Sequence, residues 1–246
     1  MTTTPTAVVT GAASGIGLAT AQRLQREGFD VLAVDRDPAG LAPLEASGMR
    51  VMAADLGDDA ARDKVIAAGE GATALVNSAG INRLKPILDL TVQDLRDVYA
   101  VNVDAVWDLT SRIGRTMPRG GAIVNLSSSS AKLSTTTEAA VYASSKAAVM
   151  SITRSFAYAF APQGVRVNSI LPGIVDTPMQ DKVLTEVAEA RGMTLQQLSE
   201  QRNKLVPLGR ASSADECAGV IWFLLSEEAG YMTGQAINFT GGLVMW

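Results

Sequence analysis

The chain has 246 residues, of which 47% are hydrophobic, and this is enough to bury a large core and excludes wholesale disorder. It has no histidine and a single cysteine, Cys217, which excludes histidine-dependent hydrolysis, histidine-ligated or multi-thiolate metal sites and an internal disulfide. Its formal net charge of −4 lacks the basic excess of a nucleic-acid binder, so we expect no nucleic-acid partner and assign no residue to a metal.

The first residues, M-T-T-T-P-T, lack the basic flank and apolar region of a signal peptide. The longest clearly apolar run, at 219–225, is too short to span a membrane. We therefore expect a cytoplasmic protein with no membrane partner.

Short apolar or β-branched runs alternate with longer segments of helical spacing along the chain. Strands this apolar are typical of a parallel sheet covered by helices on both faces. The alternation predicts an α/β fold with a doubly wound parallel sheet, in a single domain spanning residues 1–246. The predicted strands are 7–10, 31–35, 51–54, 74–77, 122–128, 165–171 and 235–239, and the predicted helices are 16–27, 38–46, 58–68, 91–117 and 139–161.

Residues 178–206 interrupt this alternation. Two polar, helix-favouring stretches, 181–190 and 194–204, follow the carboxyl end of a predicted strand. A helical lid over a ligand crevice has this pattern and position. An ordinary surface excursion has the same pattern, so the pattern alone leaves both interpretations open.

A glycine-rich turn, T-G-A-A-S-G-I-G, connects the first predicted strand to the first predicted helix. Gly11, Gly15 and Gly17 permit a tight turn and let backbone N–H groups approach a pyrophosphate at the helix N-terminus. Glycine spacing alone is a weak signal, because many turns need glycine for a positive φ. The place of the turn between the first strand and the first helix predicts a dinucleotide site.

Asp35 ends the second predicted strand. A carboxylate there accepts hydrogen bonds from the adenosine ribose and repels a 2′-phosphate, which favours NAD over NADP. Arg36 opposes this, because an arginine accommodates a 2′-phosphate. Taken alone, an acid at this position is more often a solvated residue at a strand end or a helix cap than a ribose ligand.

The segment Y-A-S-S-K places Tyr142 and Lys146 four residues apart on a predicted helix, where their side chains share a face. A nearby ammonium stabilises phenolate and lowers the pKa of a tyrosine from its ordinary value of about 10. Because the chain has no histidine, this pair is a candidate acid/base. Such a pair also arises by chance, and the four serines at 127–130 upstream also suit a polar loop.

Taken together, the motifs resemble those of the short-chain dehydrogenase/reductase family over essentially the whole chain. The resemblance implies a Rossmann-type fold, a nicotinamide cofactor and a catalytic group made of Asn102, a serine, Tyr142 and Lys146. The matching segments are T-G-A-A-S-G-I-G at 10–17, Asp55-Leu56, N-S-A-G at 77–80, Asn102, I-V-N-L-S-S at 123–128, Y-A-S-S-K at 142–146, P-G-I-V-D-T at 172–177 and the terminal T-G-G.

The resemblance also implies roles. Tyr142 exchanges a proton with the substrate oxygen, Lys146 lowers the tyrosine pKa and holds the nicotinamide ribose, and Asn102 positions a water that links Lys146 to solvent. A serine hydroxyl hydrogen-bonds the reacting oxygen. The implied cofactor-binding residues are Gly11, Ser14, Gly15, Ile16, Gly17, Asp35, Asp55, Leu56, Asn77, Ala79, Gly80, Tyr142, Lys146, Pro172, Gly173, Ile174 and Thr177. Among them, Asp55 would accept from the adenine amino group and Thr177 would bind the carboxamide.

Two features depart from the family pattern or leave it ambiguous. Ser78 replaces the second Asn of the usual N-N-A-G, which weakens one support of the sheet. Counting forward from the strand motif makes Ser128 the catalytic serine, whereas counting back from Tyr142 gives Ser129. We favour Ser128, because strand register is rigid and a loop absorbs an inserted residue.

The long segment 178–206 and the C-terminal motifs most resemble the branch of the family that acts on sugar alcohols and small diols. We therefore predict an NAD-dependent dehydrogenase of a secondary alcohol. One alternative is reduction of a 3-oxoacyl thioester with NADPH, against which Asp35 speaks. Another is a non-catalytic nucleotide-sensing protein, which would not need Asn102, Tyr142 and Lys146.

Residues 91–117 and 139–161 resemble the helices with which the family forms tetramers, so we predict a homotetramer. The alternative is that both helices only pack on their own sheet. Because 244–246 is unusually apolar for a free tail, we expect it to dock against a neighbouring subunit.

Overall fold

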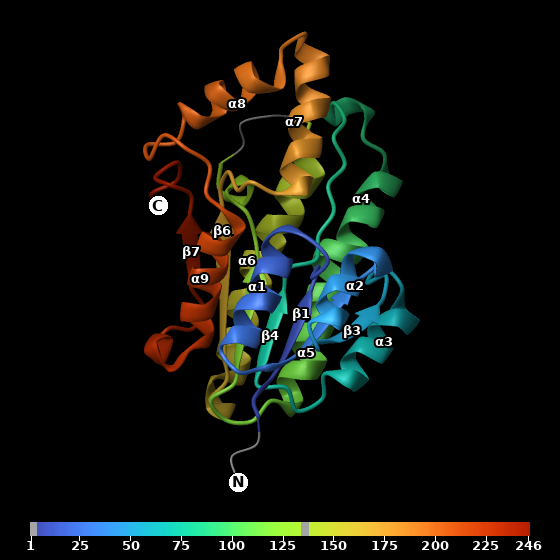
Figure 1. Cartoon of the computed structure of the whole chain (residues 1–246), viewed down its shortest axis with the longest axis vertical. Coiled ribbons are helices and arrows are strands. Elements are labelled where there is room, and N and C mark those ends of the chain that lie inside the picture. The colour runs from blue at the N-terminus through green and yellow to red at the C-terminus, as the bar shows by residue number, and fades with distance from the viewer. Residues whose placement is uncertain (1–3, 134–137) are drawn as a thin grey trace.

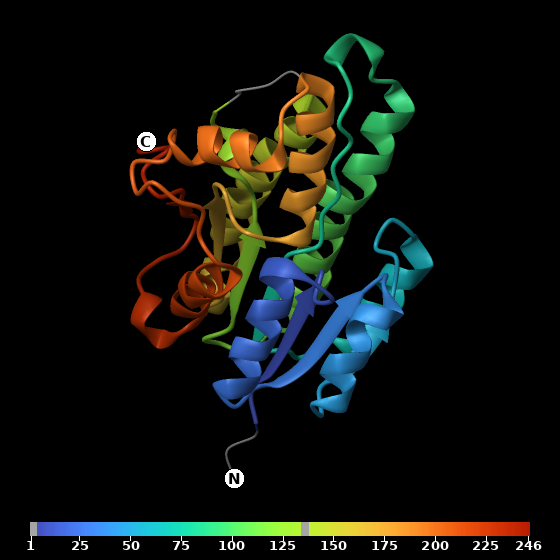
Figure 2. The same cartoon turned by 45° about the horizontal axis from the view of Figure 1, so that its top comes forward.

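A computed structural model describes residues 4–133 and 138–246, which form one seven-stranded parallel sheet between two layers of helices (Figures 1 and 2). The strand order is β3-β2-β1-β4-β5-β6-β7. The order reverses between β1 and β4, and ligands of such sheets bind outside the carboxyl ends of the strands at this point. The strands are β1 (Thr6–Thr10), β2 (Asp30–Asp35), β3 (Arg50–Ala53), β4 (Ala74–Asn77), β5 (Ala122–Leu126), β6 (Arg166–Pro172) and β7 (Ala236–Phe239).

The central strands are apolar because both of their faces are covered. In β1, Val8 belongs to the apolar cluster on one face of the sheet and Val9 to the cluster on the other. Leu75 and Val76 of β4 alternate in the same way, as the two-residue period of a strand requires. The prediction of a doubly wound parallel sheet is confirmed.

Each face has its own set of helices. The helices α1 (Gly15–Arg26), α2 (Pro38–Ala46) and α9 (Ala214–Leu225) place Leu24, Leu41 and Ile221 in the cluster that contains Val9. The helices α3 (Asp59–Ala68), α5 (Ala105–Thr116) and α6 (Ala140–Phe160) place Val65, Ile113 and Val149 in the cluster that contains Val8.

Three sequence-based predictions need correction. The single helix expected at 91–117 is α4 (Val92–Tyr99), then a π-helical turn at Ala100–Asp104, then α5. The strand expected at 122–128 ends at Leu126. Helix α9 was not predicted, because a short apolar run does not separate a buried helix from a strand. The start of α9 could have been predicted, because Ser213 and Glu216 have the spacing of the capping box that they form there.

The segment at 178–206 forms two helices, α7 (Pro178–Arg191) and α8 (Leu195–Asn203), at the top of Figure 1, on the side opposite the N-terminus. Ala188 of α7 and Leu198 of α8 are buried. The excursion leaves and returns to the body of the fold at Val175 and Ser212, which form a parallel β-bridge. No helix among the described residues is long and apolar enough to cross a membrane.

Candidate active site

The turn between β1 and α1 is packed so closely that only glycine fits at two of its positions. Gly11 has a φ of +68°, and a Cβ there would lie 2.8 Å from the Ala79 nitrogen. A Cβ on Gly17 would lie 2.0 Å from the Gly11 carbonyl oxygen. Ser14, which precedes α1, makes no side-chain cap hydrogen bond, so it leaves the first-turn N–H groups of α1 to another acceptor. A helix N-terminus of this kind suits a pyrophosphate.

The glycine turn lies against the segment that follows β6. A Cβ on Gly15 would lie 3.1 Å from Cγ2 of Thr177, the N-cap residue of α7. Pro172 is buried at the end of β6, and the N–H of Gly173 donates to the Phe239 carbonyl over 2.9 Å. Segment 172–177 therefore lies against the glycine turn at the carboxyl ends of the strands, where a crevice is expected in sheets of this kind. Two further predicted contact residues are half-buried. Ile16, in the first turn of α1, packs against the core, and the carbonyl of Ile174 accepts the Ser212 N–H over 3.0 Å.

Asp35 is held by backbone groups at the end of β2. Its Oδ2 accepts the N–H of Ala13 and its Oδ1 accepts the N–H of Asp37, each over 3.0 Å. The carboxylate therefore touches the glycine turn itself, whereas Arg36 beside it is exposed. Asp35 is therefore not a solvated acid without structural partners.

Asp55 and Leu56 follow β3 in a short turn that leads into α3. The carboxylate of Asp55 is exposed and accepts the N–H of Gly57 over 2.9 Å. The side chain of Leu56 is buried in the core cluster that contains Val8. With the space left by the glycines and the carboxylate at Asp35, these residues fit the two phosphates and the adenosine of a dinucleotide.

The end of β4 supplies backbone to the crevice, while its asparagine points into the core. Asn77 is 2% exposed and donates to Thr110 Oγ1 over 3.0 Å and to Asn125 Oδ1 over 2.8 Å. The N–H groups of Ser78 and Ala79 donate to the hydroxyl of Thr10 over 3.1 and 3.2 Å. Asn77 is therefore a structural side chain, which ties β4 to β5 and α5.

Gly80 is the point at which three of the expected residues meet. A Cβ on Gly80 would lie 3.3 Å from Lys146 Nζ and 3.4 Å from Asn102 Oδ1. Asn102 is fully buried in the π-helical turn, a feature that is frequent at functional sites. Its Oδ1 accepts the Ile81 N–H over 2.8 Å, and its Nδ2 donates to the Ile81 carbonyl and to Ser145 Oγ, both over 3.0 Å.

The structure places Ser128, and not Ser129, at Tyr142. A side-chain hydrogen bond joins Ser128 to Tyr142 and acts to lower the pKa of the tyrosine. The Ser128 oxygen also accepts the N–H of Ser130 over 3.1 Å, which holds the hydroxyl at the end of β5. Ser129 is half-buried and begins a 3-10 turn at Ser129–Ala131.

Tyr142 and Lys146 lie side by side on α6, with Lys146 Nζ 5.6 Å from the centre of the tyrosine ring. Lys146 is 3% exposed, and burial lowers its pKa to about 8. Burial raises the pKa of Tyr142, and only the bond to Ser128 opposes that rise. The expected lowering by Lys146 is therefore not seen. The Lys146 Nζ instead donates to the Leu126 carbonyl over 2.8 Å.

Sequence reasoning missed the residues that hold this group in place. Ser127 is buried and donates to the Lys146 carbonyl over 2.7 Å, and Ser145 joins the Tyr142 carbonyl to Asn102. Ser145 lies inside the segment Y-A-S-S-K, so the motif contained the signal. Among the described residues, no group of three or more His, Cys, Asp or Glu side chains is placed to hold a metal ion.

Comparison with known proteins gives matches over nearly the whole chain. A family model described as enoyl-(acyl carrier protein) reductase matches residues 11–244. The chain is 32% identical to L-2,3-butanediol dehydrogenase of Corynebacterium glutamicum, over 97% of this chain and 98% of the relative. It is 36% identical to galactitol 2-dehydrogenase (L-tagatose-forming) of Cereibacter sphaeroides, over 98% and 95%.

A relative with a different substrate is almost as similar. The chain is 35% identical to the 3-oxoacyl-[acyl-carrier-protein] reductase of Thermotoga maritima, over 97% of both chains. Among solved structures, a short chain dehydrogenase family protein from Francisella tularensis subsp. tularensis SCHU S4 aligns with a TM-score of 0.90. Its sequence identity is 26%, and the alignment covers 98% of both chains.

Proposed function

The chain belongs to the short-chain dehydrogenase/reductase family and is an oxidoreductase, and from this premise we propose that it oxidises a secondary alcohol with NAD, the alcohol being a sugar alcohol or small diol. The observation that carries the proposal is the hydrogen-bonded pair of Ser128 and Tyr142, with Lys146 lying over the tyrosine ring. We assign the catalytic roles to these three residues and to Asn102.

Tyr142 is the acid/base in this proposal. In the oxidative direction its phenolate takes the proton of the substrate hydroxyl, and in reduction its hydroxyl returns that proton to the carbonyl oxygen. Ser128 meets the same substrate oxygen in this proposal, since a side-chain hydrogen bond places its hydroxyl beside the phenol. Its hydroxyl stabilises the charge that develops on the reacting oxygen.

NAD, when bound, supplies the hydride acceptor. The residues proposed to hold it are those that border the crevice from the glycine turn to segment 172–177. Asp35 is proposed to select NAD, because its carboxylate would face a 2′-phosphate with like charge and an unmatched acceptor. The backbone bonds that fix both Asp35 oxygens support this, because they keep the carboxylate beside the turn.

Lys146 and Asn102 are proposed to return the proton to solvent. The ammonium of Lys146 has a pKa of about 8, so near neutral pH it holds its proton and gives it up readily. Asn102 lies beside it across Gly80. Its amide is fixed by Ile81 and Ser145, which gives a water at this point a rigid partner.

The substrate class rests on the relatives. A diol dehydrogenase and a polyol dehydrogenase align with this chain over nearly its whole length. The 3-oxoacyl-[acyl-carrier-protein] reductase is the specific observation that favours a second candidate, reduction of a 3-oxoacyl thioester with NADPH. We prefer the alcohol because Asp35 suits NAD.

The test is a panel of C3 to C6 polyols and diols, their ketoses and ketones, and a 3-oxoacyl thioester, each with NAD(H) and NADP(H). We expect the highest kcat/KM for a polyol or diol with NAD. A preference for the 3-oxoacyl thioester with NADPH would establish the second candidate. Tight NAD binding without turnover of any substrate would identify a nucleotide sensor.

We propose further that residues 1–246 act as one dinucleotide-binding and catalytic domain and that the protein is a homotetramer. The helical faces expected to pair expose large side chains, since Trp107 on α5 is 53% exposed and Tyr158 on α6 is 89% exposed. Exposed aromatic side chains of this size are typical of interfaces.

The cytoplasmic location and the docking of 244–246 on a neighbouring subunit stay predictions. Val244 is buried, whereas the side chains of Met245 and Trp246 are exposed.

A further inference from the structure

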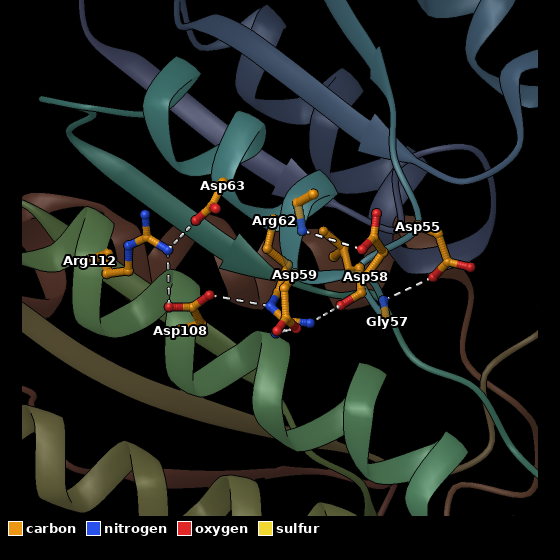
Figure 3. Close-up of polar contacts among 10 residues, drawn as sticks. Asp55, Gly57, Asp58, Asp59, Arg62, Asp63, Asp108 and Arg112 are labelled. Carbon is orange, nitrogen blue, oxygen red and sulfur yellow. Dashed lines mark hydrogen bonds and ion pairs between the residues drawn. The ribbon is translucent and has the colours of Figure 1, made fainter.

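Arg62 on α3 is an almost completely buried cation, only 8% exposed. An arginine is rarely buried unless its donors and its charge are matched. Its Nη1 donates to the Leu56 carbonyl over 2.8 Å, its Nε to Asp108 Oδ2 over 3.2 Å, and its Nη2 to the Asp59 carboxylate (Figure 3). The two carboxylates therefore balance the charge of the guanidinium, and its Nη1 is left to bind the Leu56 carbonyl.

That carbonyl belongs to the turn between β3 and α3. The turn is compact, because Asp55 Oδ1 accepts the Gly57 N–H over 2.9 Å and the Asp58 N–H donates to the Asp55 carbonyl over 3.1 Å. The turn also lies close to the π-helical turn, since a Cβ on Gly57 would be 3.6 Å from Val101 Cγ2. The bond from Arg62 to Leu56 fixes this turn to α3.

The guanidinium is itself fixed by α5. Asp108 of α5 binds Arg62 and also Arg112, whose Nη1 lies 3.5 Å from Asp108 and 2.6 Å from Asp63 of α3 (Figure 3). Arg112 is 43% exposed and shares the carboxylate network between the same two helices. Arg112 forms ion pairs with Asp63 and Asp108. It is therefore a matched control for Arg62, which also binds the Leu56 carbonyl.

We propose that Arg62 is a positioning residue for the adenine end of the dinucleotide. Without touching the nucleotide, it holds the Leu56 carbonyl and so orients the Asp55 carboxylate at the end of the crevice. The inference rests on the proposed function, and on the family resemblance by which Asp55 would accept from the adenine amino group. It predicts that Arg62 governs dinucleotide affinity and not the chemical step.

The experiment measures binding of NADH and of ADP-ribose to the full chain by isothermal titration calorimetry. In Arg62→Leu, we expect the Kd of both ligands to rise by the same factor of about tenfold, as follows from losing a hydrogen bond to a charged donor. With saturating NAD, kcat and the KM for the alcohol should stay within about twofold of wild type. The Arg112→Leu variant should keep both Kd values within about twofold.

The outcomes separate this inference from the proposed function. Wild-type protein that binds no NADH would overturn both. Wild-type protein that binds NADH, with an Arg62→Leu variant of unchanged Kd or with equal losses in Arg112→Leu, would overturn the inference alone. If Arg62→Leu does not fold, Asp108→Asn removes the charge that anchors the guanidinium and keeps the side-chain shape. A rise in Kd of about threefold or more then supports the inference, and an unchanged Kd overturns it.

Discussion

Replacement of Ser128 by Ala removes one oxygen from the candidate site and two of its hydrogen bonds, those to Tyr142 and to the Ser130 N–H. The Ser130 N–H is only partly buried, in the 3-10 turn at Ser129–Ala131, so water should replace the lost acceptor and the fold should tolerate the change. At Tyr142, the bond to Ser128 is what opposes the rise in pKa caused by burial. The variant should therefore need a higher pH to form phenolate, and the reacting oxygen should lose a donor.

The expected loss in kcat/KM for alcohol oxidation is about 10²- to 10³-fold, the usual cost of one donor at a developing oxyanion. The rising limb of the pH profile for oxidation should also move to higher pH. The assay follows NADH formation across pH, with NADH affinity and Tm as controls for folding. Ser129→Ala is the matched control, since Ser129 begins the 3-10 turn outside the Tyr142 contact, and it should stay within about twofold of wild type. Equal losses in the two variants, or an active Ser128→Ala enzyme, would refute the reasoning.

Three further predictions address the acid/base, the cofactor and the buried lysine. Tyr142→Phe should lower kcat by at least about 10²-fold while NADH binding persists, and a variant that retains most of its turnover would exclude Tyr142 as the base. Asp35→Ala should narrow or reverse a wild-type preference for NAD of about tenfold or more in kcat/KM, and a wild-type preference for NADP would contradict the assignment of Asp35. Because the folded-state pKa of Lys146 is depressed to about 8, the folded chain loses this proton before the unfolded chain does. Its burial penalty is full below pH 8 and falls as the pH rises. Urea unfolding should therefore show about 2 kcal/mol of extra stability gained between pH 8 and pH 10 in wild type relative to Lys146→Met, and equal gains would contradict the buried ammonium.

Elements with strong local signals were predictable at residue resolution. Helix α2 begins at Pro38 and ends at Ala46 as expected, because Asp37 caps it and proline suits the first helical position. Strand β4 was predicted with its exact bounds, since Ala74, Leu75 and Val76 form an apolar run that indicates a buried strand and a turn follows Asn77. Here propensity, capping and burial favour the same conformation.

Features that depend on contacts between distant segments were not predictable. The π-helical turn at Asn102 widens a helix whose sequence has ordinary helical spacing, and its amide is matched by Ile81 and Ser145 from two other segments. The raised pKa of Tyr142 reflects its burial, which a spacing of four residues does not reveal. The burial of Arg62 was not predictable either, because its partner Asp108 lies 46 residues further along the chain, on α5.

The β-bridge between Val175 and Ser212 brings together the two points at which the α7–α8 excursion leaves and rejoins the fold. The Asp176 N–H donates to the Ser212 carbonyl over 2.9 Å, and the Ser212 N–H to the Ile174 carbonyl over 3.0 Å, so these ends are fixed whatever lies between them. Because the ends of the excursion are already joined, an insertion or deletion inside it changes mainly the entropic cost of closing this loop. That free-energy cost grows slowly with the length of the loop. Divergence and recombination can therefore exchange this segment between relatives while the half of the protein that carries the glycine turn stays unaltered. A chimaera that takes residues 176–211 from a relative of different substrate range should fold and should inherit the donor's substrates.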